Sequence, residues 1–470
     1  MKVLLADLPL RDWGLDASYP NMGLLYLLAY LRSTLSPEGV EVRYLDARHN
    51  LGQHIAAVRE FQPDLYGLSL SSLGMRHLPT IVSAVRQAVP HAAIICGGPG
   101  PTAEPELALA SEDVDLCVIG EGEETLREVV EVAALGSRAA LAEAVVAGTA
   151  VRSNGDVVKL PPRRPIADLD ELPFPAWDAV DLASYPGMFL KRASPETNVL
   201  VSRGCPFDCC FCSNPVWKAS RPWLRSRSPE DVAEEVEWLY QRGVREVYLA
   251  SDELNFSEQR ALDLCEALAS LGHKDLYFQC NMRAHPLSDE LARALARMNC
   301  WLVHLGIESA NDRVLAGIGK HVTVAQIEEA CARLSRHGIR VFAFMMLYQA
   351  WEENGRLAWE TTDEVENSLR FTRRMFRQGT IHYMSWQFCT PLPGSRLYGI
   401  AQRHGLLPHD LSGGYEHRVN MRLPGIEARE MQRMLRKGIL LKDWYILRSG
   451  ALSLRHLGRV WENLRSAVGR

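Results

Sequence analysis

Asn198-Val-Leu-Val-Ser202, an apolar stretch, runs directly into Arg203-Gly-Cys205-Pro-Phe-Asp-Cys209-Cys-Phe211-Cys212. This second stretch places three thiols at C-x3-C-x2-C spacing. Three thiolates on one tight loop can hold three irons of a cubane cluster. A 4Fe-4S cluster normally takes four cysteines, so the loop leaves one iron without a protein ligand. The spacing therefore predicts a reactive iron-sulfur centre.

A zinc site or a set of structural cysteines is the alternative interpretation of the same residues. Zinc sites usually recruit their ligands as two pairs separated by a dozen or more residues. No second Cys or His pair lies near this loop. The spacing thus favours the iron-sulfur cluster over zinc or a disulfide.

The loop and its flanks resemble the radical S-adenosylmethionine (SAM) superfamily. In that family the amino and carboxylate groups of SAM bind the open iron, and an electron from a donor such as flavodoxin or ferredoxin leads to a 5'-deoxyadenosyl radical. The resemblance implies that Cys205, Cys209 and Cys212 are the cluster ligands and that Phe211 lies beside the adenine. Cys210 has no role in the pattern.

The composition indicates an ordinary globular protein. The chain has 470 residues, of which 47% are hydrophobic and 23% charged, and its net charge is -5. Polyanion binders usually carry a basic excess, so we expect no nucleic-acid partner. No stretch reaches the roughly 18 apolar residues of a membrane span, and the eleven cysteines suit a reducing compartment. We therefore expect a cytoplasmic protein without a membrane partner.

Short β-branched runs alternate with longer helical patterns over the first 150 residues. This alternation is typical of a parallel sheet wrapped by helices, so we predict an α/β domain of flavodoxin-like or Rossmann-like architecture. The predicted strands are 3–6, 40–45, 65–70, 93–96 and 116–119, and the predicted helices are 22–32, 52–61 and 78–89.

Small or polar residues follow three of these predicted strands, where ligands of open α/β sheets bind. They are Ser69, Ser71, Gly97, Gly98, Gly120, Glu121 and Gly122. Together they resemble the cobalamin-binding domain fused to many radical SAM enzymes, which implies that they contact cobalamin. Tight turns alone, or a domain that has lost its ligand, are the alternatives.

One near-match concerns the cobalt ligand. Asp46-Ala-Arg-His49-Asn-Leu-Gly52 is similar to the D-x-H-x-x-G pattern of cobalamin proteins that supply a histidine, but it has one extra residue and follows the second predicted strand. We therefore expect cobalamin to be held without a protein histidine, and His49 to be a surface or helix-start residue.

Proline-rich segments between residues 160 and 177 break regular structure and indicate a domain boundary. We predict a cobalamin-binding-type domain (1–150), a linker (151–194), a radical SAM barrel (195–400) and a C-terminal helical region (401–470). The second domain reads as a partial, TIM-like (β/α)6 barrel with later strands at 246–250, 276–280, 301–305, 339–345 and 381–386.

Active sites of such barrels lie at the carboxyl ends of the strands. Resemblance to the family implies that SAM contacts Asp252, Glu253, Arg283, Glu308 and Ser309, which follow predicted strands, and that Lys320 assists. Surface salt bridges and strand-end caps are the alternative for each. His304 and Met345-Met346 are expected to be core residues.

The sequence departs from the family pattern after the fifth barrel strand, where an aromatic segment runs from Leu347 to Thr362. Such an insertion can shape a substrate pocket or form a surface loop. Binding of amino groups would need an acid near the substrate, and the candidates are Asp16, Glu352, Glu353 and Glu360.

The combination of cluster, SAM and cobalamin implies C-methylation of a small metabolite, such as a sugar, aminocyclitol or other secondary metabolite of antibiotic biosynthesis. A radical SAM dehydratase, epimerase, cyclase or oxidoreductase with an empty cobalamin domain is the alternative. A non-catalytic cobalamin sensor conflicts with the intact cysteine motif. Modification of a peptide or RNA is disfavoured, because the chain shows neither the basic excess of nucleic-acid binders nor an evident peptide- or RNA-binding appendage.

Overall fold

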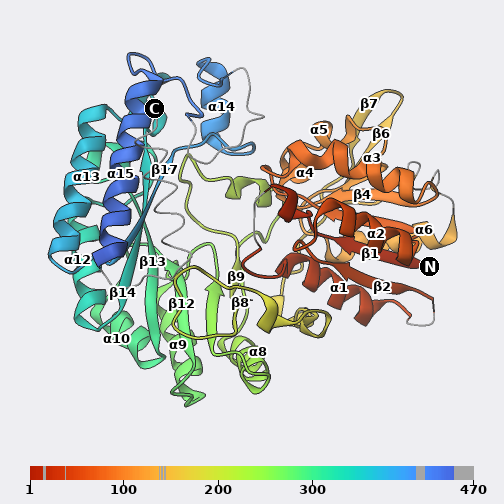
Figure 1. The fold of residues 1–470 in the computed structure, drawn as a ribbon, viewed down its shortest axis with the longest axis horizontal. Helices are drawn as coiled ribbons and strands as arrows, with labels where there is room; N and C mark the ends of the chain where they lie inside the picture. Colours follow the sequence, from red (N-terminus) through yellow and green to blue (C-terminus); the bar gives the residue numbers. More distant parts are fainter. Residues whose placement is uncertain are drawn as a thin grey trace. The chain divides into compact units, whose positions relative to one another are not determined.

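The computed structural model describes residues 1–13, 17–36, 39–136, 138, 141, 144–408 and 419–448. The chain divides into two compact units (Figure 1). The first contains Met1–Gly204 and Asn214–Val247, and the second contains Cys205–Ser213 and the described residues from Tyr248 onward. Predicted Asp16 and residues 449–470 lie outside the described residues.

A seven-stranded sheet of order β2-β1-β3-β4-β5-β6-β7 forms the centre of the first unit. The five strands from β1 to β5 are parallel, and β6 and β7 continue the sheet in antiparallel sense. The strands are β1 (Lys2–Ala6), β2 (Glu41–Leu45), β3 (Leu65–Ser69), β4 (Ala93–Gly97), β5 (Leu116–Val118), β6 (Thr149–Ser153) and β7 (Asp156–Lys159). The order 2-1-3-4-5 is that of flavodoxin-like folds, so the predicted architecture is confirmed.

Helices cover both faces of this sheet because its strands are apolar on both sides. Leu4 of β1 packs into one core with α2 and α3, while Leu5 packs into another with α1 and α6. The helices are α1 (Met22–Thr34), α2 (Leu51–Phe61), α3 (Leu78–Ala88), α4 (Pro99–Ala103), α5 (Pro105–Leu109) and α6 (Glu123–Leu135).

The predicted linker is folded within the first unit. Residue 151, its predicted start, lies inside β6, because the segments on either side of Asn154-Gly155, a dipeptide that favours hairpin turns, form the β6–β7 hairpin. Further along, the Trp177 indole donates a hydrogen bond of 2.8 Å to Glu235 of α8. The unit also contains β8 (Glu196–Leu200), β9 (Ser202–Arg203), β10 (Arg225–Ser226) and α8 (Pro229–Gln241).

The second sheet has the order β17-β14-β13-β12-β11-β8, and β12, β13, β14 and β17 pair in parallel. Its later strands are β11 (Glu246–Ala250), β12 (Tyr277–Met282), β13 (Cys300–Glu308), β14 (Arg340–Leu347) and β17 (Tyr383–Phe388). Six strands in this order, alternating with helices, match the partial barrel predicted from the sequence.

Helices lie against one face of this second sheet (Figure 1). They include α9 (Glu258–Ser270), α10 (Asp289–Arg297), α12 (Val324–Arg336), α13 (Thr362–Arg377) and α15 (Ala428–Arg448). The short helices α11 (Asp312–Gly317) and α14 (Arg396–Arg403) contact the inserted segment described below. Gly438 lets α15 approach β17, since a Cβ there would lie 2.6 Å from Trp386. The inserted segment forms the hairpin of β15 (Ala350–Glu353) and β16 (Arg356–Trp359). Among the described residues, no helix combines the length and hydropathy needed to cross a membrane.

Candidate active site

The cysteine loop is anchored by its fourth cysteine. Cys210 is buried; its N–H donates to the Ile318 carbonyl at 2.8 Å, and its carbonyl accepts from the Leu397 N–H at 2.8 Å. The Cys210 thiol donates to the Ala350 carbonyl at 3.5 Å. These bonds satisfy Cys210 inside the protein, so it holds the loop in place rather than presenting a ligand.

The other three thiols of the loop remain accessible. None of the eleven cysteines, all of them described, forms a disulfide; Cys205, Cys209 and Cys212 are half-buried, and the other eight are buried. Burial, together with the nearby Glu253 and Asp252 carboxylates, raises the pKa of Cys205 to about 11. A positively charged iron centre would reverse this balance by binding the thiolate. These three thiols therefore fit an iron-sulfur cluster.

Among the described residues, no three His, Cys, Asp or Glu side chains are grouped closely enough to hold a single metal ion.

Arg283 follows β12 and lies beside one of these thiols. Its guanidinium stacks 3.6 Å from the Phe207 ring centroid, and its Nη1 is 3.8 Å from Cys209 Sγ. The Asn255 amide holds the Arg283 backbone with two hydrogen bonds of 3.0 Å. Arg283 Nε and Nη2 are buried without a partner. Two orphaned donors on a buried cation fit a carboxylate ligand.

Glu308 and Lys320 form a buried ion pair of 3.1 Å nearby. Glu308 has φ 66°, a conformation that non-glycine residues rarely adopt outside functional sites. A Cβ on Gly306 would lie 2.6 Å from Glu308 Oε1 and 2.7 Å from Lys320 Nζ. Glycine at 306 therefore gives the ion pair its room.

Glu253 completes this group of charges. Burial raises the pKa of Glu253 to about 7, although the charges of Lys320 and Arg283 oppose the shift. Burial also acts to lower the pKa of Lys320, but the negative charges of Glu308 and Cys209 outweigh it and raise that pKa. Glu253 Oε1 has no hydrogen-bond partner, so it can accept from an ammonium group.

The structure gathers four of the predicted SAM contacts in one place and leaves a fifth at the surface. Arg283, Glu253, Glu308 and Lys320 are brought together beside the thiols, with orphaned polar atoms that fit a ligand carrying both an amino group and a carboxylate. Asp252 is exposed, although its charge reaches Cys205.

Glycines line the carboxyl edge of the first sheet. Gly98 has φ 94°, and a Cβ there would lie 2.9 Å from the Leu70 carbonyl and 3.3 Å from Ser69 Oγ. Gly120 has φ 80° with nothing within 4 Å of its Cβ position. The Ser69 hydroxyl accepts from Asn21 at 3.4 Å. This close-packed, side-chain-free edge fits a large flat ligand lying against the backbone.

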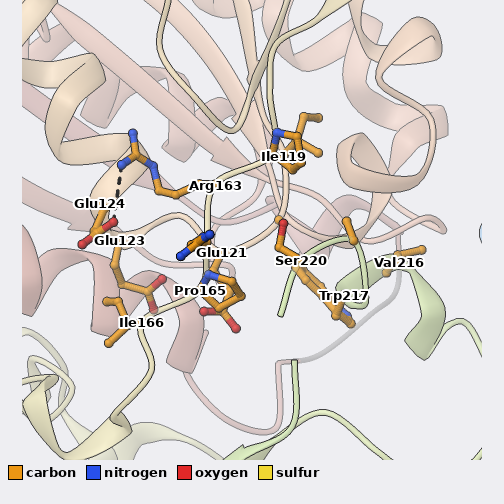
Figure 2. Close-up of a pocket in the computed structure, with 14 residues that line it drawn as sticks. Ile119, Glu121, Glu123, Glu124, Arg163, Pro165, Ile166, Val216, Trp217 and Ser220 are labelled. Atoms are coloured by element: carbon orange, nitrogen blue, oxygen red, sulfur yellow. Dashed lines mark hydrogen bonds and ion pairs between the residues drawn. The ribbon is translucent and has the colours of Figure 1, made fainter. Parts of the chain in front are cut away.

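The carboxylates of the Gly-Glu-Gly-Glu segment have protein partners. Glu123 accepts from Arg203 at 2.6 Å, and Glu121 pairs with Arg203 at 3.2 Å and accepts from Arg225 at 2.9 Å. Figure 2 shows Glu121 and Glu123 in a pocket with Arg163 and Trp217. The cobalamin contact predicted for Glu121 therefore competes with two arginines, while Gly122 packs against Leu27.

Comparisons with known proteins match both parts of the chain. The B12 binding domain model covers residues 15–130, and the radical SAM superfamily model covers residues 199–354. The chain is a radical SAM enzyme with a B12-binding domain. Its cofactors are therefore a 4Fe-4S cluster, SAM and cobalamin.

Several curated relatives resemble this radical SAM enzyme. An uncharacterized methyltransferase of Pyrococcus horikoshii is 29% identical over 393 residues, 83% of this chain and 80% of that protein. The anaerobic magnesium-protoporphyrin IX monomethyl ester cyclase of Cereibacter sphaeroides is 26% identical over 391 residues, 78% of this chain and 62% of that protein. The cytidylyl-2-hydroxyethylphosphonate methyltransferase of Streptomyces wedmorensis is 25% identical over 435 residues, 81% of this chain and 78% of that protein.

Solved structures share the fold of the enzyme. The radical SAM methyltransferase TsrM from Kitasatospora setae, with cobalamin and cluster bound, gives a TM-score of 0.65 at 18% identity and covers 92% of this chain and 84% of its own. OxsB, with aqua-cobalamin and SAM bound, gives a TM-score of 0.70 at 18% identity and covers 99% of this chain and 71% of its own. At such identities the likeness shows the fold alone.

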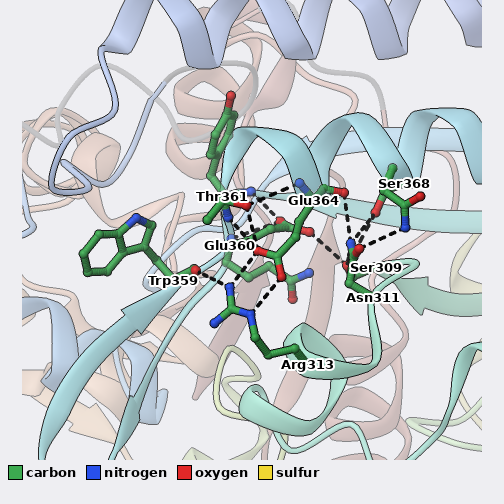
Figure 3. Close-up of polar contacts among 11 residues, drawn as sticks. Ser309, Asn311, Arg313, Trp359, Glu360, Thr361, Glu364 and Ser368 are labelled. Atoms are coloured by element: carbon green, nitrogen blue, oxygen red, sulfur yellow. Dashed lines mark hydrogen bonds and ion pairs between the residues drawn. The ribbon is translucent and has the colours of Figure 1, made fainter.

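Ser309, a predicted SAM contact, and Ser71, a predicted cobalamin contact, both have hydroxyl groups that hydrogen-bond within the protein. The Ser309 hydroxyl donates to Glu360 Oε1 at 2.9 Å within a buried network that includes Asn311 and Ser368 (Figure 3). The Ser71 hydroxyl accepts from the Gly74 N–H at 3.1 Å in a turn. Phe211 packs beside Cys210. Their predicted contacts with SAM, cobalamin and adenine stay predictions.

Other residues considered in the sequence are also placed. His49 Nδ1 lies 2.9 Å from the Asp46 carbonyl, in the loop before α2. Glu352 pairs with Arg403 and His404 at 2.8 Å each, and Glu353 is exposed. Glu352 is thus engaged by two basic side chains, and Glu353 faces solvent.

Glu360 is a buried member of the four acids that the sequence offered as candidates for binding substrate amino groups. It ends the insertion, and Glu360 Oε2 accepts from the Tyr348 N–H at 2.8 Å. Burial raises the pKa of Glu360 to about 8, although the Ser309 hydroxyl and backbone donors oppose the shift. Glu360 therefore anchors the inserted hairpin to the end of β13 and carries a proton near neutral pH.

Stability should fall as pH rises because of this proton. Between the ordinary carboxyl pKa of 4.5 and about 8 the native state holds a proton that the unfolded chain has lost, which lowers the free energy of unfolding by up to about 1.4 kcal/mol per pH unit. Urea unfolding at pH 5, 7 and 9 should show a flatter dependence for Glu360→Gln. Glu352→Gln, in the same insertion, is the control with an unchanged slope. Equal slopes for wild type and Glu360→Gln would contradict the assignment.

Substitution of Gly98 by alanine should remove most of the retained cobalamin, because the new methyl group would collide with the Leu70 backbone at the sheet edge. Gly155→Ala is the matched control: its φ is 88°, but nothing lies within 4 Å of its Cβ position. Gly98 also has ψ -174°, a backbone region essentially restricted to glycine, so its alanine variant carries backbone strain in addition to the collision. Absorbance of cobalamin per purified chain measures the difference, and equal retention by the two variants would count against a cobalamin site at this edge.

Proposed function

We propose that the enzyme is a cobalamin-dependent radical SAM methyltransferase that acts on a small molecule. The observation that carries the proposal is that three accessible thiols lie beside the buried charges of Arg283, Glu253 and the Glu308–Lys320 pair, in a chain that also has a glycine-lined B12-binding domain. Relatives named as methyltransferases over most of both chains support methyl transfer.

Residue roles follow from the contacts. Cys205, Cys209 and Cys212 hold three irons, and the orphaned Arg283 donors bind the SAM carboxylate while Glu253 accepts from its amino group. The Glu308–Lys320 pair lies beside these charges and helps to position them, and Phe211 borders the adenine. When bound, the cluster and SAM supply hydrogen abstraction from an unactivated carbon, and cobalamin supplies a methyl group.

In the first unit, Ser69, Gly97, Gly98, Gly120 and Gly122 let cobalamin lie against the strand ends. Ser71 and Glu121 border this edge. An electron donor such as flavodoxin or ferredoxin reduces the cluster, and the enzyme acts in the cytoplasm. A sugar, an aminocyclitol or another secondary metabolite remains within the substrate range, and antibiotic biosynthesis is one setting that supplies such molecules.

A second function is a radical reaction without methyl transfer, such as cyclisation, dehydration or oxidation. The observation that favours it is the similarity to the Cereibacter cyclase, since the match covers 62% of that protein's length. This alternative needs the cluster and SAM but no methyl donor.

The two functions differ in what they make from SAM. We would reconstitute the enzyme anaerobically with and without hydroxocobalamin, add dithionite and SAM labelled with deuterium in the methyl group, and quantify S-adenosylhomocysteine and 5'-deoxyadenosine. Methyl transfer predicts S-adenosylhomocysteine only in samples with cobalamin, since methylation of the cofactor consumes a SAM methyl group. Formation of 5'-deoxyadenosine alone, at equal rates with and without cobalamin, would replace the proposal with the second function.

A further inference from the structure

The two faces of the second sheet differ in what they expose. Side chains alternate between faces along a strand, and the face that bears Leu305, Ala343 and Met345 is buried under helices. The opposite face bears Tyr248, His304, Phe342, Phe344, Met346 and Gln387, and we call it the inner face. Register places His304 beside Phe342, and Met346 beside Gln387.

Aromatic rings form a continuous surface on the inner face. The ring centroids of His304 and Phe342 are 5.2 Å apart, those of Phe342 and Phe344 are 5.0 Å apart, and Tyr248 lies 5.6 Å from His304. Phe342, Phe344 and Met346 are half-buried and Gln387 is exposed. Large apolar side chains left partly open in the middle of a sheet mark a ligand-binding surface.

The inner face adjoins the proposed SAM site. Arg283 directly follows β12, two residues after Asn281, and Gly306, beside the Glu308–Lys320 pair, is in register with Phe344. Phe344, Met346 and Gln387 thus occupy the end of the inner face toward the thiols, where a substrate must lie to react.

Charge is missing from this part of the surface. On β12, β13, β14 and β17, the strand positions in register with the inner face carry no Asp, Glu, Lys or Arg beyond Arg340 at the amino end of β14. His304 adds no charge, because burial lowers its pKa to about 4 and Nε2 lies 2.9 Å from Gln279 Oε1. A polycationic substrate would find no carboxylate partner on these four strands, and Glu352 and Glu360 of the insertion already have protein partners.

We propose that the substrate is an uncharged small molecule with a flat, unsaturated ring system, which stacks on Phe342 and Phe344 and hydrogen-bonds to the Gln387 amide. This inference rests on the proposed function, since it names the substrate class of the same site. Aromatic pairs in offset or edge contact supply binding free energy beyond area burial, and a neutral amide recognises hydroxyl or amide groups without selecting charge.

Ligand-observed NMR on the reconstituted full-length enzyme with SAM tests the proposal, using three probes. N-acetyltryptophanamide is neutral and aromatic, N-acetylleucinamide is neutral without a ring, and neamine is a polycationic aminocyclitol glycoside. The expected order of affinity is N-acetyltryptophanamide first, with no detectable binding of neamine. Tighter binding of neamine or of N-acetylleucinamide than of the aromatic probe would overturn the proposal.

Two variants locate the binding on the inner face. Phe344→Ala should weaken binding of N-acetyltryptophanamide about tenfold, whereas Trp444→Ala, which removes an aromatic side chain that is 60% exposed on α15, should not change it. Equal losses in both would overturn the assignment. Gln387→Glu alters an exposed side chain, so its folding does not depend on core packing, and it should weaken the aromatic probe and admit neamine; unchanged preference would also overturn the assignment.

The failure of this inference and that of the proposed function are separable. S-adenosylhomocysteine and 5'-deoxyadenosine are measured on the same wild-type samples without any probe. If cobalamin-dependent S-adenosylhomocysteine forms but the probes bind in the wrong order, only the proposed substrate class is rejected. If the probes bind in the expected order but no cobalamin-dependent S-adenosylhomocysteine forms, only methyl transfer is rejected.

Discussion

Replacement of Cys212 by serine should abolish SAM cleavage, whereas replacement of its neighbour Cys210 by serine should leave cleavage intact. The reason is that Cys212 is a half-buried thiol of the predicted ligand set, while Cys210 is buried and bonded to the Ala350 carbonyl, a contact that a serine hydroxyl can also make. Iron content should stay near four per chain in Cys210→Ser and fall below one in Cys212→Ser. Iron assay and 5'-deoxyadenosine formation after anaerobic reconstitution measure both.

Cys205→Ser and Cys209→Ser should behave like Cys212→Ser. The expected loss is to background because a thiolate is the ligand that these clusters require. A Cys210→Ser protein without iron, or a Cys212→Ser protein with a full cluster and SAM cleavage, would reassign the ligand set. Thermal unfolding of each variant distinguishes loss of the cluster from loss of the fold.

Glu123→Ala should destabilise the first unit far more than Glu124→Ala. The two glutamates are neighbours in the first turn of α6, so both interact alike with the helix dipole. The Glu123 side chain is 5% exposed and pairs with Arg203, whereas that of Glu124 is 40% exposed beside Arg163. Breaking a buried pair costs about 3–5 kcal/mol, and losing an exposed one costs about 0–1 kcal/mol.

Denaturant unfolding of the two variants checks the expected difference of at least about 2 kcal/mol. The pKa of Glu123 supports the charged pair: burial acts to raise it, but the Arg203 charge and hydrogen bond outweigh burial and lower it. Equal destabilisation by the two substitutions would show that the Glu123–Arg203 pair contributes no more than a surface contact. Arg203 precedes Cys205 by two residues, so iron content of Glu123→Ala reports in addition whether the pair supports the cluster loop.

Local pattern was sufficient for much of the fold. The predicted strand at 93–96 is β4 (Ala93–Gly97), and the predicted helix at 52–61 is α2 (Leu51–Phe61), because alternation and helical periodicity are properties of neighbouring residues. The β6–β7 hairpin was missed, since β7 is largely exposed and both strands are antiparallel, outside the β–α alternation of the parallel strands. The β15–β16 hairpin was expected only as an aromatic insertion.

The candidate site divides in the same way. Spacing within one loop identified Cys205, Cys209 and Cys212, and strand ends identified Arg283 and Glu308. The partners of Glu121 and Ser309 had no such signal, because Arg225 is 104 residues from Glu121 and Glu360 is 51 residues from Ser309. A charged or polar residue at a strand end has the same local sequence whether it binds a cofactor or a distant side chain.

The sequence by itself determined the cysteine spacing, the alternating elements and the chemistry that three thiols allow, because each of these depends on residues within one turn or strand of one another. Only the tertiary structure decided which cysteine is an anchor, which glutamates are taken by arginines and which side of β14 faces helices. Met345 and Met346 are neighbours in sequence, yet the first is buried and the second half-exposed on the inner face. Burial is set by packing between distant segments, and this packing distinguishes a ligand-binding side chain from one that stabilises the core.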